Sequence, residues 1–145
     1  MIVRKVIVER VPLNKLLCKN MKPGIKLISE IEGSGEEIRR QKTYLMRLRF
    51  WLNKGEPIIW EAPWGLIDRA ELLENGATLI TDLRVDRESM INGLFYGVQG
   101  MRVGGTRKLK ISHHLAYGES GVKGLIPENA VILAEISVIE ERKFA

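Results

Sequence analysis

The chain has 145 residues, of which 45% are hydrophobic and 28% are charged, and its formal net charge is +5. These values are typical of a single globular domain with a core of its own. The single cysteine, Cys18, excludes an internal disulfide, and no run of about 18 apolar residues is present to span a membrane.

The positive charge is concentrated in the first part of the chain. Residues 1–54 hold 13 Lys and Arg against 5 Asp and Glu, whereas residues 55–145 hold 10 against 13. A basic surface attracts nucleic acids or acidic partners, but these basic residues are scattered and accompany no nucleic-acid-binding motif. We therefore expect a solvated basic face and no nucleic-acid partner. The lone thiol and the lack of a signal-peptide core near Met1 favour a cytoplasmic protein.

The first half of the chain predicts three strands. β-Branched residues favour a short strand between Met1 and Pro12, and Met21-Lys-Pro-Gly24 predicts a turn. A second strand is expected over 25–31, before a loop over 32–35. The third is expected over 44–52, where alternation places four side chains on one face: Tyr44, Met46, Leu48 and Phe50.

After a tight turn at 53–55, the middle of the chain predicts a short helix and a strand. The helix is expected over 68–75, with Asp68 as its N-cap and Gly76 just past its end. The strand is expected over 78–85, where apolar and polar residues alternate.

A second helical segment is expected within 89–100. Its apolar residues recur at helical spacing, with Ser89 as a plausible N-cap: Ile91, Leu94, Phe95, Val98 and Met101. Three glycines lie in the same segment, and each costs about 1 kcal/mol relative to alanine in a helix interior. We therefore predict a short helix whose backbone is closely approached by another element.

Two more strands are expected, over 107–112 and 130–141, and the long loop 113–127 connects them. In the first, Leu109 and Ile111 face inward while Lys108 and Lys110 face outward. Many strands and one principal helix predict an α+β fold, with a single antiparallel sheet and a helix packed on one face. A connection as long as 113–127 is more often functional than idle.

Motifs for covalent, metal or cofactor chemistry are lacking. His113 and His114 are adjacent, so they point to opposite sides of an extended chain, and no cluster of Cys or carboxylates accompanies them. The glycines around Gly100 do not match a phosphate-binding loop, and no serine lies in a nucleophile elbow. We expect no metal and no cofactor, so an enzyme of this kind acts through binding and environment alone.

One family fits that requirement. The stretch Gly97-Val-Gln-Gly-Met-Arg-Val-Gly-Gly-Thr-Arg-Lys-Leu-Lys-Ile111 resembles the helix end, glycine turn and next strand of the FKBP family. Leu115-Ala-Tyr-Gly118 and Ile126-Pro-Glu-Asn129 resemble its Ala-Tyr-Gly loop and its Ile-Pro-Pro-Asn turn. The resemblance is close over residues 90–140 and weaker over 24–55.

The resemblance implies a bent antiparallel sheet wrapped around one short helix, with an insertion between two strands. Residues 1–23 then form an N-terminal extension, and residues 24–145 form an isomerase domain with the insertion at about 56–80. The implied activity is peptidyl-prolyl cis-trans isomerisation in protein folding, on proline-containing peptides or unfolded protein. Macrolide ligands are the other implied partners.

The resemblance also assigns the site. Four positions carry the implied catalytic roles: Tyr117, Phe50, Ile91 and Leu94. Four more line the implied substrate pocket: Met90, Leu125, Ile126 and Ala134. The backbone around Ile91 and the Tyr117 hydroxyl are the implied hydrogen-bonding groups.

The chain also departs from the family pattern. Leu94 stands where the family has a tryptophan on the pocket floor, and Ala134 replaces an aromatic residue. Glu56-Pro-Ile-Ile-Trp60 replaces a Phe-Asp pair. Trp60 and Trp64 lie in the expected insertion, where they either refill the lost space or bind a partner, and we expect its part over 65–76 beside the pocket mouth. The departures leave open an alternative, a catalytically weak module that binds a specific protein, and predict reduced affinity for macrolides.

Overall fold

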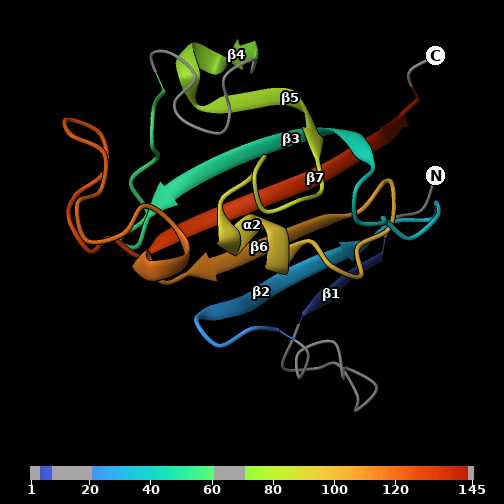
Figure 1. Ribbon diagram of the computed structural model, residues 1–145, viewed down its shortest axis with the longest axis horizontal. Coiled ribbons are helices and arrows are strands. Elements are labelled where there is room, and N and C mark those ends of the chain that lie inside the picture. Colours follow the sequence, from blue (N-terminus) through green and yellow to red (C-terminus); the bar gives the residue numbers. More distant parts are fainter. Residues whose placement is uncertain (1–3, 8–20, 61–70, 144–145) are drawn as a thin grey trace.

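The computed structural model describes residues 4–7, 21–60 and 71–143, which form one antiparallel sheet and one short α-helix (Figure 1). The order of the seven strands across the sheet is β1-β2-β6-β7-β3-β5-β4. Their bounds are β1 Arg4–Ile7, β2 Ile25–Glu32, β3 Thr43–Leu52, β4 Glu71–Leu73, β5 Thr78–Arg84, β6 Thr106–Ile111 and β7 Ile132–Arg142. The α+β architecture expected from the sequence is therefore confirmed.

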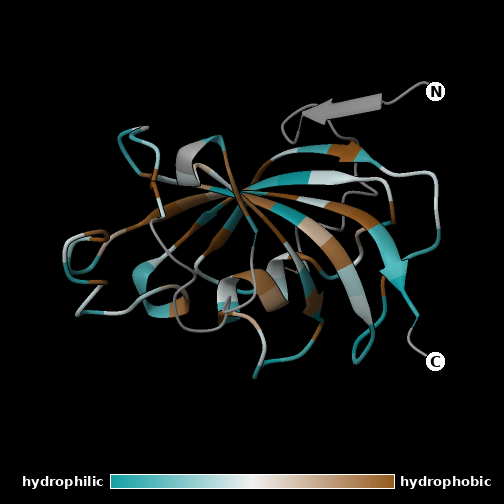
Figure 2. Ribbon diagram, turned by 90° about the horizontal axis from the view of Figure 1, so that it is seen from above, coloured by the Kyte–Doolittle hydropathy of each residue, from teal (hydrophilic) through white to brown (hydrophobic). Residues whose placement is uncertain are grey.

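Alternation of apolar and polar residues places one face of the sheet against the core (Figure 2). On β3 the four predicted inward side chains are almost completely buried: Tyr44, Met46, Leu48 and Phe50. Leu109 and Ile111 of β6 are also buried, as predicted. Every strand that the alternation predicts within the described residues is present, which confirms the pattern as a guide to the sheet.

The helix α2 spans Asn92–Gly97 and packs on the inner face of the sheet (Figure 1). Its Leu94 and Phe95 are buried, as is Val98 directly after it. A Cβ atom at Gly93 would overlap the side chain of Ile111, and one at Gly97 would overlap Leu109. The prediction of a short helix with a closely approached backbone is therefore confirmed.

Two local predictions are wrong. The segment expected to be helical over 68–75 is β4 from Glu71 to Leu73, followed by the 3-10 turn η2, Glu74–Gly76, and Asp68 lies outside the described residues. The free edge of β5 supplies hydrogen-bonding groups to this segment, with Leu72 opposite Leu79, and this pairing outweighs the local preference for a helix.

The second wrong prediction is the cap of α2. Ile91, not Ser89, occupies the N-cap position, and no side chain caps the helix. The amide N–H groups of Glu88 and Ser89 instead donate to the Asp86 carboxylate, at 3.0 and 2.7 Å. Asp86 thus closes the turn that leads into the helix, three residues before the predicted cap.

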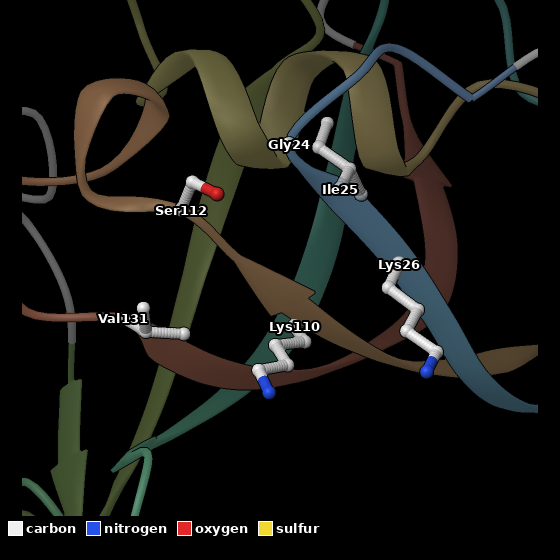
Figure 3. A pocket seen from close by; sticks show the side chains of 6 residues that line it. All are labelled: Gly24, Ile25, Lys26, Lys110, Ser112 and Val131. Carbon is white, nitrogen blue, oxygen red and sulfur yellow. The ribbon is translucent and has the colours of Figure 1, made fainter.

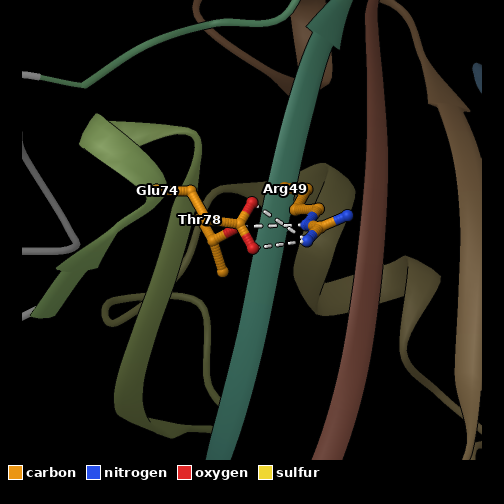
Figure 4. A network of polar contacts seen from close by, with 3 residues as sticks. All are labelled: Arg49, Glu74 and Thr78. Atoms are coloured by element: carbon orange, nitrogen blue, oxygen red, sulfur yellow. Dashed lines mark hydrogen bonds and ion pairs between the residues drawn. The ribbon is translucent and has the colours of Figure 1, made fainter.

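A polar network fixes the return from β4 to β5 against β3 (Figure 4). Arg49 of β3 donates to Glu74 Oε1 and to Thr78 Oγ1, both at 2.9 Å, and Thr78 donates to Glu74 Oε2 at 3.1 Å. Thr78 is buried, whereas Arg49 and Glu74 are partly exposed. The described helices include none that is long and apolar enough to cross a membrane.

Candidate functional site

Four of the predicted site residues lie in the core that β3, β7 and the α2 region share. Phe50 of β3 lies directly opposite Ala134 of β7 in the strand register. Both are 1% exposed or less, as are Met90 and Leu94. All four belong to the same hydrophobic core cluster.

The long loop before β7 carries three more of the predicted residues, Tyr117, Leu125 and Ile126, which pack in or against this core. It begins with the 3-10 turn η3, His113–Leu115, which packs beside the helix, because a Cβ at Gly93 would lie 3.0 Å from the Leu115 carbonyl oxygen. Further along, the Val122 and Ile126 backbones exchange two hydrogen bonds of 2.9 and 2.8 Å. This closed turn holds the loop against the core.

The predicted residues divide into a buried layer and a partly exposed layer. The buried layer has Phe50, Met90, Leu94, Ile126 and Ala134. The half-buried layer, packed against it, has Ile91, Tyr117 and Leu125. A ligand that docks on this cluster therefore first meets the three half-buried side chains.

Two hydrogen-bond donors in the half-buried layer are unused. Within the described part of the chain, the Tyr117 hydroxyl makes no hydrogen bond, and the Ile91 amide N–H has no acceptor. The Ile91 carbonyl is engaged by Leu94 and Phe95, both at 3.0 Å. Burial raises the pKa of Tyr117 to about 12. The hydroxyl consequently keeps its proton, and its capacity to donate, throughout the neutral range.

Trp60 also belongs to this cluster. From the sequence, Trp60 was expected either to refill the space lost in the pocket or to bind a partner. It is 2% exposed, and its ring contacts Phe50 at a centroid distance of 5.9 Å and Tyr117 at 6.1 Å. Its indole Nε1 is buried and has no hydrogen-bond partner in the part of the chain that the structure describes. The signal in the sequence was the departure at residues 56–60, but nothing in the sequence gave the direction of the ring. Trp64, and residues 65–70 of the segment expected at the pocket mouth, lie outside the described residues.

The described residues contain no group of three or more His, Cys, Asp or Glu side chains that could hold a metal ion. A pocket of about 230 Å³ lies between the ends of β2, β6 and β7 (Figure 3). It is lined by none of the predicted site residues, and Lys26 and Lys110 stand beside each other at its rim. A larger hollow of about 440 Å³, beside Phe95, is lined mainly by charged residues. Neither has the apolar character of the cluster around Tyr117.

Comparison with known proteins identifies relatives of this chain. The family described as FKBP-type peptidyl-prolyl cis-trans isomerase matches residues 73–139. FK506-binding protein 1A of Neurospora crassa is 31% identical over 117 residues, which cover 80% of this chain and 87% of that protein. Peptidyl-prolyl cis-trans isomerase FPR2 of Saccharomyces cerevisiae is 40% identical over 70 residues, covering 48% of this chain and 50% of that protein.

Solved structures show the same fold. The crystal structure of AtFKBP13 superposes with a TM-score of 0.66 at 24% identity, covering 85% of this chain and 98% of that one. The N-terminal domain of FKBP42 from Arabidopsis thaliana gives a TM-score of 0.61 at 21% identity, with coverage of 84% and 89%. The chain spans half or less of the length of several curated relatives it matches, but the Neurospora protein is matched over most of both chains. The chain therefore belongs to the FKBP-type peptidyl-prolyl cis-trans isomerase family.

Proposed function

We propose that this chain is a peptidyl-prolyl cis-trans isomerase, or rotamase, that acts on X-Pro bonds of peptides and unfolded proteins. Membership of the family supports the activity. The local observation that carries it is the Tyr117 hydroxyl, which makes no hydrogen bond within the described residues and stands at the edge of an apolar cluster.

The chemistry of X-Pro rotation suits such a cluster. The barrier of about 18–20 kcal/mol comes from amide resonance, and the unaided reaction takes tens to hundreds of seconds. A twisted amide has lost this resonance and is less polar, so an apolar surface favours it over the planar ground state. No acid, base, nucleophile or metal is needed for the rotation.

Each predicted residue has a role in this proposal. The Tyr117 hydroxyl donates to the carbonyl before the rotating bond, and the Ile91 N–H donates to the peptide on the other side of the proline. Ile91 and Leu125 contact the prolyl ring. The buried layer shapes the apolar surface from beneath: Phe50, Met90, Leu94, Ile126 and Ala134.

We propose that residues 24–145 form the isomerase domain, with 56–80 as an insertion and 1–23 as an extension. In support, β1 pairs with β2, so the extension adds an edge strand to the same sheet. We also propose a role in protein folding and a cytoplasmic location, which the single cysteine supports. Macrolides are proposed as ligands with reduced affinity.

The alternative, a binding module without useful turnover, is not favoured by the comparisons. The isomerase family matches residues 73–139, which hold α2 and the Tyr117 loop, and a yeast relative named as an isomerase is 40% identical over 70 residues. The replacements at Leu94 and Ala134 remain the only argument for it, and Trp60 now occupies space next to Phe50, which faces Ala134.

A protease-coupled isomerisation assay on a panel of X-Pro peptides tests the proposal. We expect turnover by the parent protein, a loss of up to about tenfold in kcat/KM for Tyr117→Phe, since one neutral hydrogen bond contributes about 0.5–1.5 kcal/mol, and a larger loss for Tyr117→Ala. Tyr96→Phe is the matched control, because Tyr96 is also half-buried but packs against Phe95 on α2.

Melting temperatures of the same variants separate catalysis from stability. If Tyr117 only pins the loop, both variants melt earlier and still bind peptide normally at low temperature. Unchanged turnover in Tyr117→Ala means that the assigned site is wrong. No turnover by the folded parent protein on any X-Pro peptide contradicts the proposed function itself.

A further inference from the structure

The indole N–H of Trp60 is an exception to a general rule about protein interiors. Buried polar groups nearly always have a hydrogen-bond partner, so an unpaired one requires an explanation. Nε1 of Trp60 is buried and has no hydrogen-bond partner among residues 4–7, 21–60 and 71–143, and the side chain as a whole is 2% exposed. Trp60 contacts two rings of the candidate site, Phe50 and Tyr117. The unpaired donor therefore belongs to that site.

The backbone holds the indole in this position. The Trp60 N–H donates to the Gly76 carbonyl at 2.9 Å, and the Ile58 N–H donates to the Phe50 carbonyl at 2.9 Å. Gly76 has a φ of +94°, and a Cβ there would overlap the carbonyl oxygen of Trp60. Only glycine fits so close to another backbone in this conformation. These backbone contacts hold the segment that carries the indole against β3 and Gly76.

We propose that Trp60 is a substrate-binding residue, whose Nε1–H donates to a backbone carbonyl of the bound prolyl peptide. The inference builds on the proposed function and adds a donor from a different part of the chain. Of the two rings that contact the indole, only Tyr117 is partly exposed. In this proposal the peptide therefore reaches the indole from the Tyr117 side of the cluster, where the Tyr117 hydroxyl binds a second carbonyl of the same peptide.

The chemistry of proline explains why unpaired donors suit this site. A prolyl residue has a carbonyl but no backbone N–H, so its peptide is rich in acceptors and poor in donors. The cluster offers the opposite set, with the Tyr117 hydroxyl, the Ile91 N–H and the Trp60 indole. A peptide that leaves these donors unpaired loses affinity, which gives selectivity for an acceptor at the right distance from the proline.

Trp60→Phe tests the inference, because it keeps an aromatic ring and removes the N–H. We expect X-Pro peptide affinity to fall about 2- to 12-fold, the range for one neutral hydrogen bond, with a rise in KM. The matched control is Trp51→Phe. Trp51 lies on the opposite face of β3, under the Lys108 ammonium at 4.7 Å, and we expect no change there.

Peptides with a single thioamide near the proline locate the acceptor, since sulfur accepts hydrogen bonds more weakly than oxygen. One thioamide position weakens binding to the parent protein and has no effect on Trp60→Phe. In the parent protein, the indole N–H proton resonance of Trp60 moves downfield when the peptide binds, while that of Trp51 does not. This second measurement does not depend on how well the variant folds.

The inference is overturned if Trp60→Phe binds peptide as tightly as Trp51→Phe, or if the Trp60 indole resonance does not move in the peptide complex. Either result leaves the proposed function intact when the parent protein turns over X-Pro peptides. A parent protein that neither binds nor turns over these peptides contradicts the proposed function instead.

Discussion

The two ends of α2 differ in whether the polar groups around them are hydrogen-bonded within the protein. Past its last residue, the Arg107 guanidinium is 0% exposed and donates through Nη1 to the carbonyls of Gly97 and Gln99, at 2.9 and 2.7 Å. Its Nε donates to Glu30 Oε2 at 2.8 Å. At the other end no side chain caps the helix, and Ile91 packs against the hydrophobic core that also holds Tyr117 and Trp60.

Among the described residues, two buried side-chain nitrogens have no hydrogen-bond partner: Nη2 of Arg107 and Nε1 of Trp60. The two cases differ because Arg107 makes three other hydrogen bonds, which hold its guanidinium in place. The indole has no second donor, so its only polar group is unpaired. At the end of α2, the Arg107 guanidinium and its three hydrogen bonds form a structural anchor. Near its start, the hydrogen-bond donors remain available for a ligand.

The largest expected effect comes from breaking the anchor. Arg107→Met leaves the Glu30 carboxylate and two helix-end carbonyls without their donor, and breaking a buried pair in this way costs about 3–5 kcal/mol. Urea denaturation measures the change in the free energy of unfolding. Lys110→Met is the control, because Lys110 lies on the same strand but faces outward. If Arg107→Met lowers the free energy of unfolding no more than Lys110→Met does, the hydrogen bonds of Arg107 do not stabilise the fold.

A double variant sharpens the same point. Replacing both Arg107 and Glu30 by methionine removes the charge that the single change leaves unpaired, and apolar replacement of a whole buried pair is often near neutral. We expect the double variant to recover part of the stability lost in Arg107→Met. A fully additive loss means that the two residues do not act as a pair.

The sequence predicted which face of β6 points inward, but it did not predict the buried ion pair between Arg107 and Glu30. Leu109 and Ile111 were predicted to face the core, and both are buried. Arg107, two residues before Leu109, was not predicted to face the core, yet it is also buried. Its partner was hidden, because the strand register shifts between Leu27 and Ser29 and turns Glu30 toward the core. An irregularity of this kind reverses the face of every later residue, and no periodicity reveals it.

The candidate site near the start of α2 was predicted from the family resemblance, and only some of its residues were predicted in this way. The positions of Phe50 and Leu94 follow from strand and helix spacing, since both face the core. Trp60 required its backbone pairing with Gly76, a contact between segments whose conformation the sequence did not specify. The donors that distinguish this end therefore became visible only with the tertiary structure.

The next largest effect is a loss of stability at alkaline pH, which comes from the Tyr117 hydroxyl of the candidate site. Burial raises the pKa of Tyr117 to about 12, from about 10 for a tyrosine in water. The folded state therefore holds this proton more tightly than the unfolded state, and the resulting stability is complete below pH 10 and is lost as pH rises toward 12. We expect the parent protein to lose about 2–3 kcal/mol more than Tyr117→Phe over this window, from about 1.4 kcal/mol per pKa unit. Equal losses in the two proteins mean that Tyr117 is not shielded from solvent.

Macrolide binding is the third test. Leu94 and Ala134 each replace a large flat side chain of the family, and such a loss corresponds to about 1–3 kcal/mol at roughly 25 cal/mol per Å². We expect weaker than usual macrolide binding, and a further loss when Trp60 and Trp64 are both changed to alanine. Nanomolar affinity of that double variant in calorimetry contradicts the prediction.

The smallest expected effect concerns Asp86, which stands in for the missing cap of α2. Partial burial pushes the pKa of Asp86 up, but hydrogen bonds from Ser89 and from the Glu88 backbone, together with Arg84, outweigh it and leave this pKa below its ordinary value. A carboxylate with a lowered pKa contributes stability at neutral pH that is lost as the solution is acidified below the ordinary value of about 3.9.

We expect Asp86→Asn to remove this acid sensitivity while the amide oxygen still closes the turn. Because the network is near the surface and screened by solvent, the difference from the parent protein stays below about 1 kcal/mol. Melting temperatures between pH 7 and pH 2 measure it, with Glu88→Gln as the control, since Glu88 is exposed. The turn connects β5 to Met90 and Ile91, so peptide KM measured at pH 7 reports whether it also positions the donor end of the helix. A KM that changes in Asp86→Asn, with stability at pH 7 unchanged, assigns the turn to the site as well as to the fold.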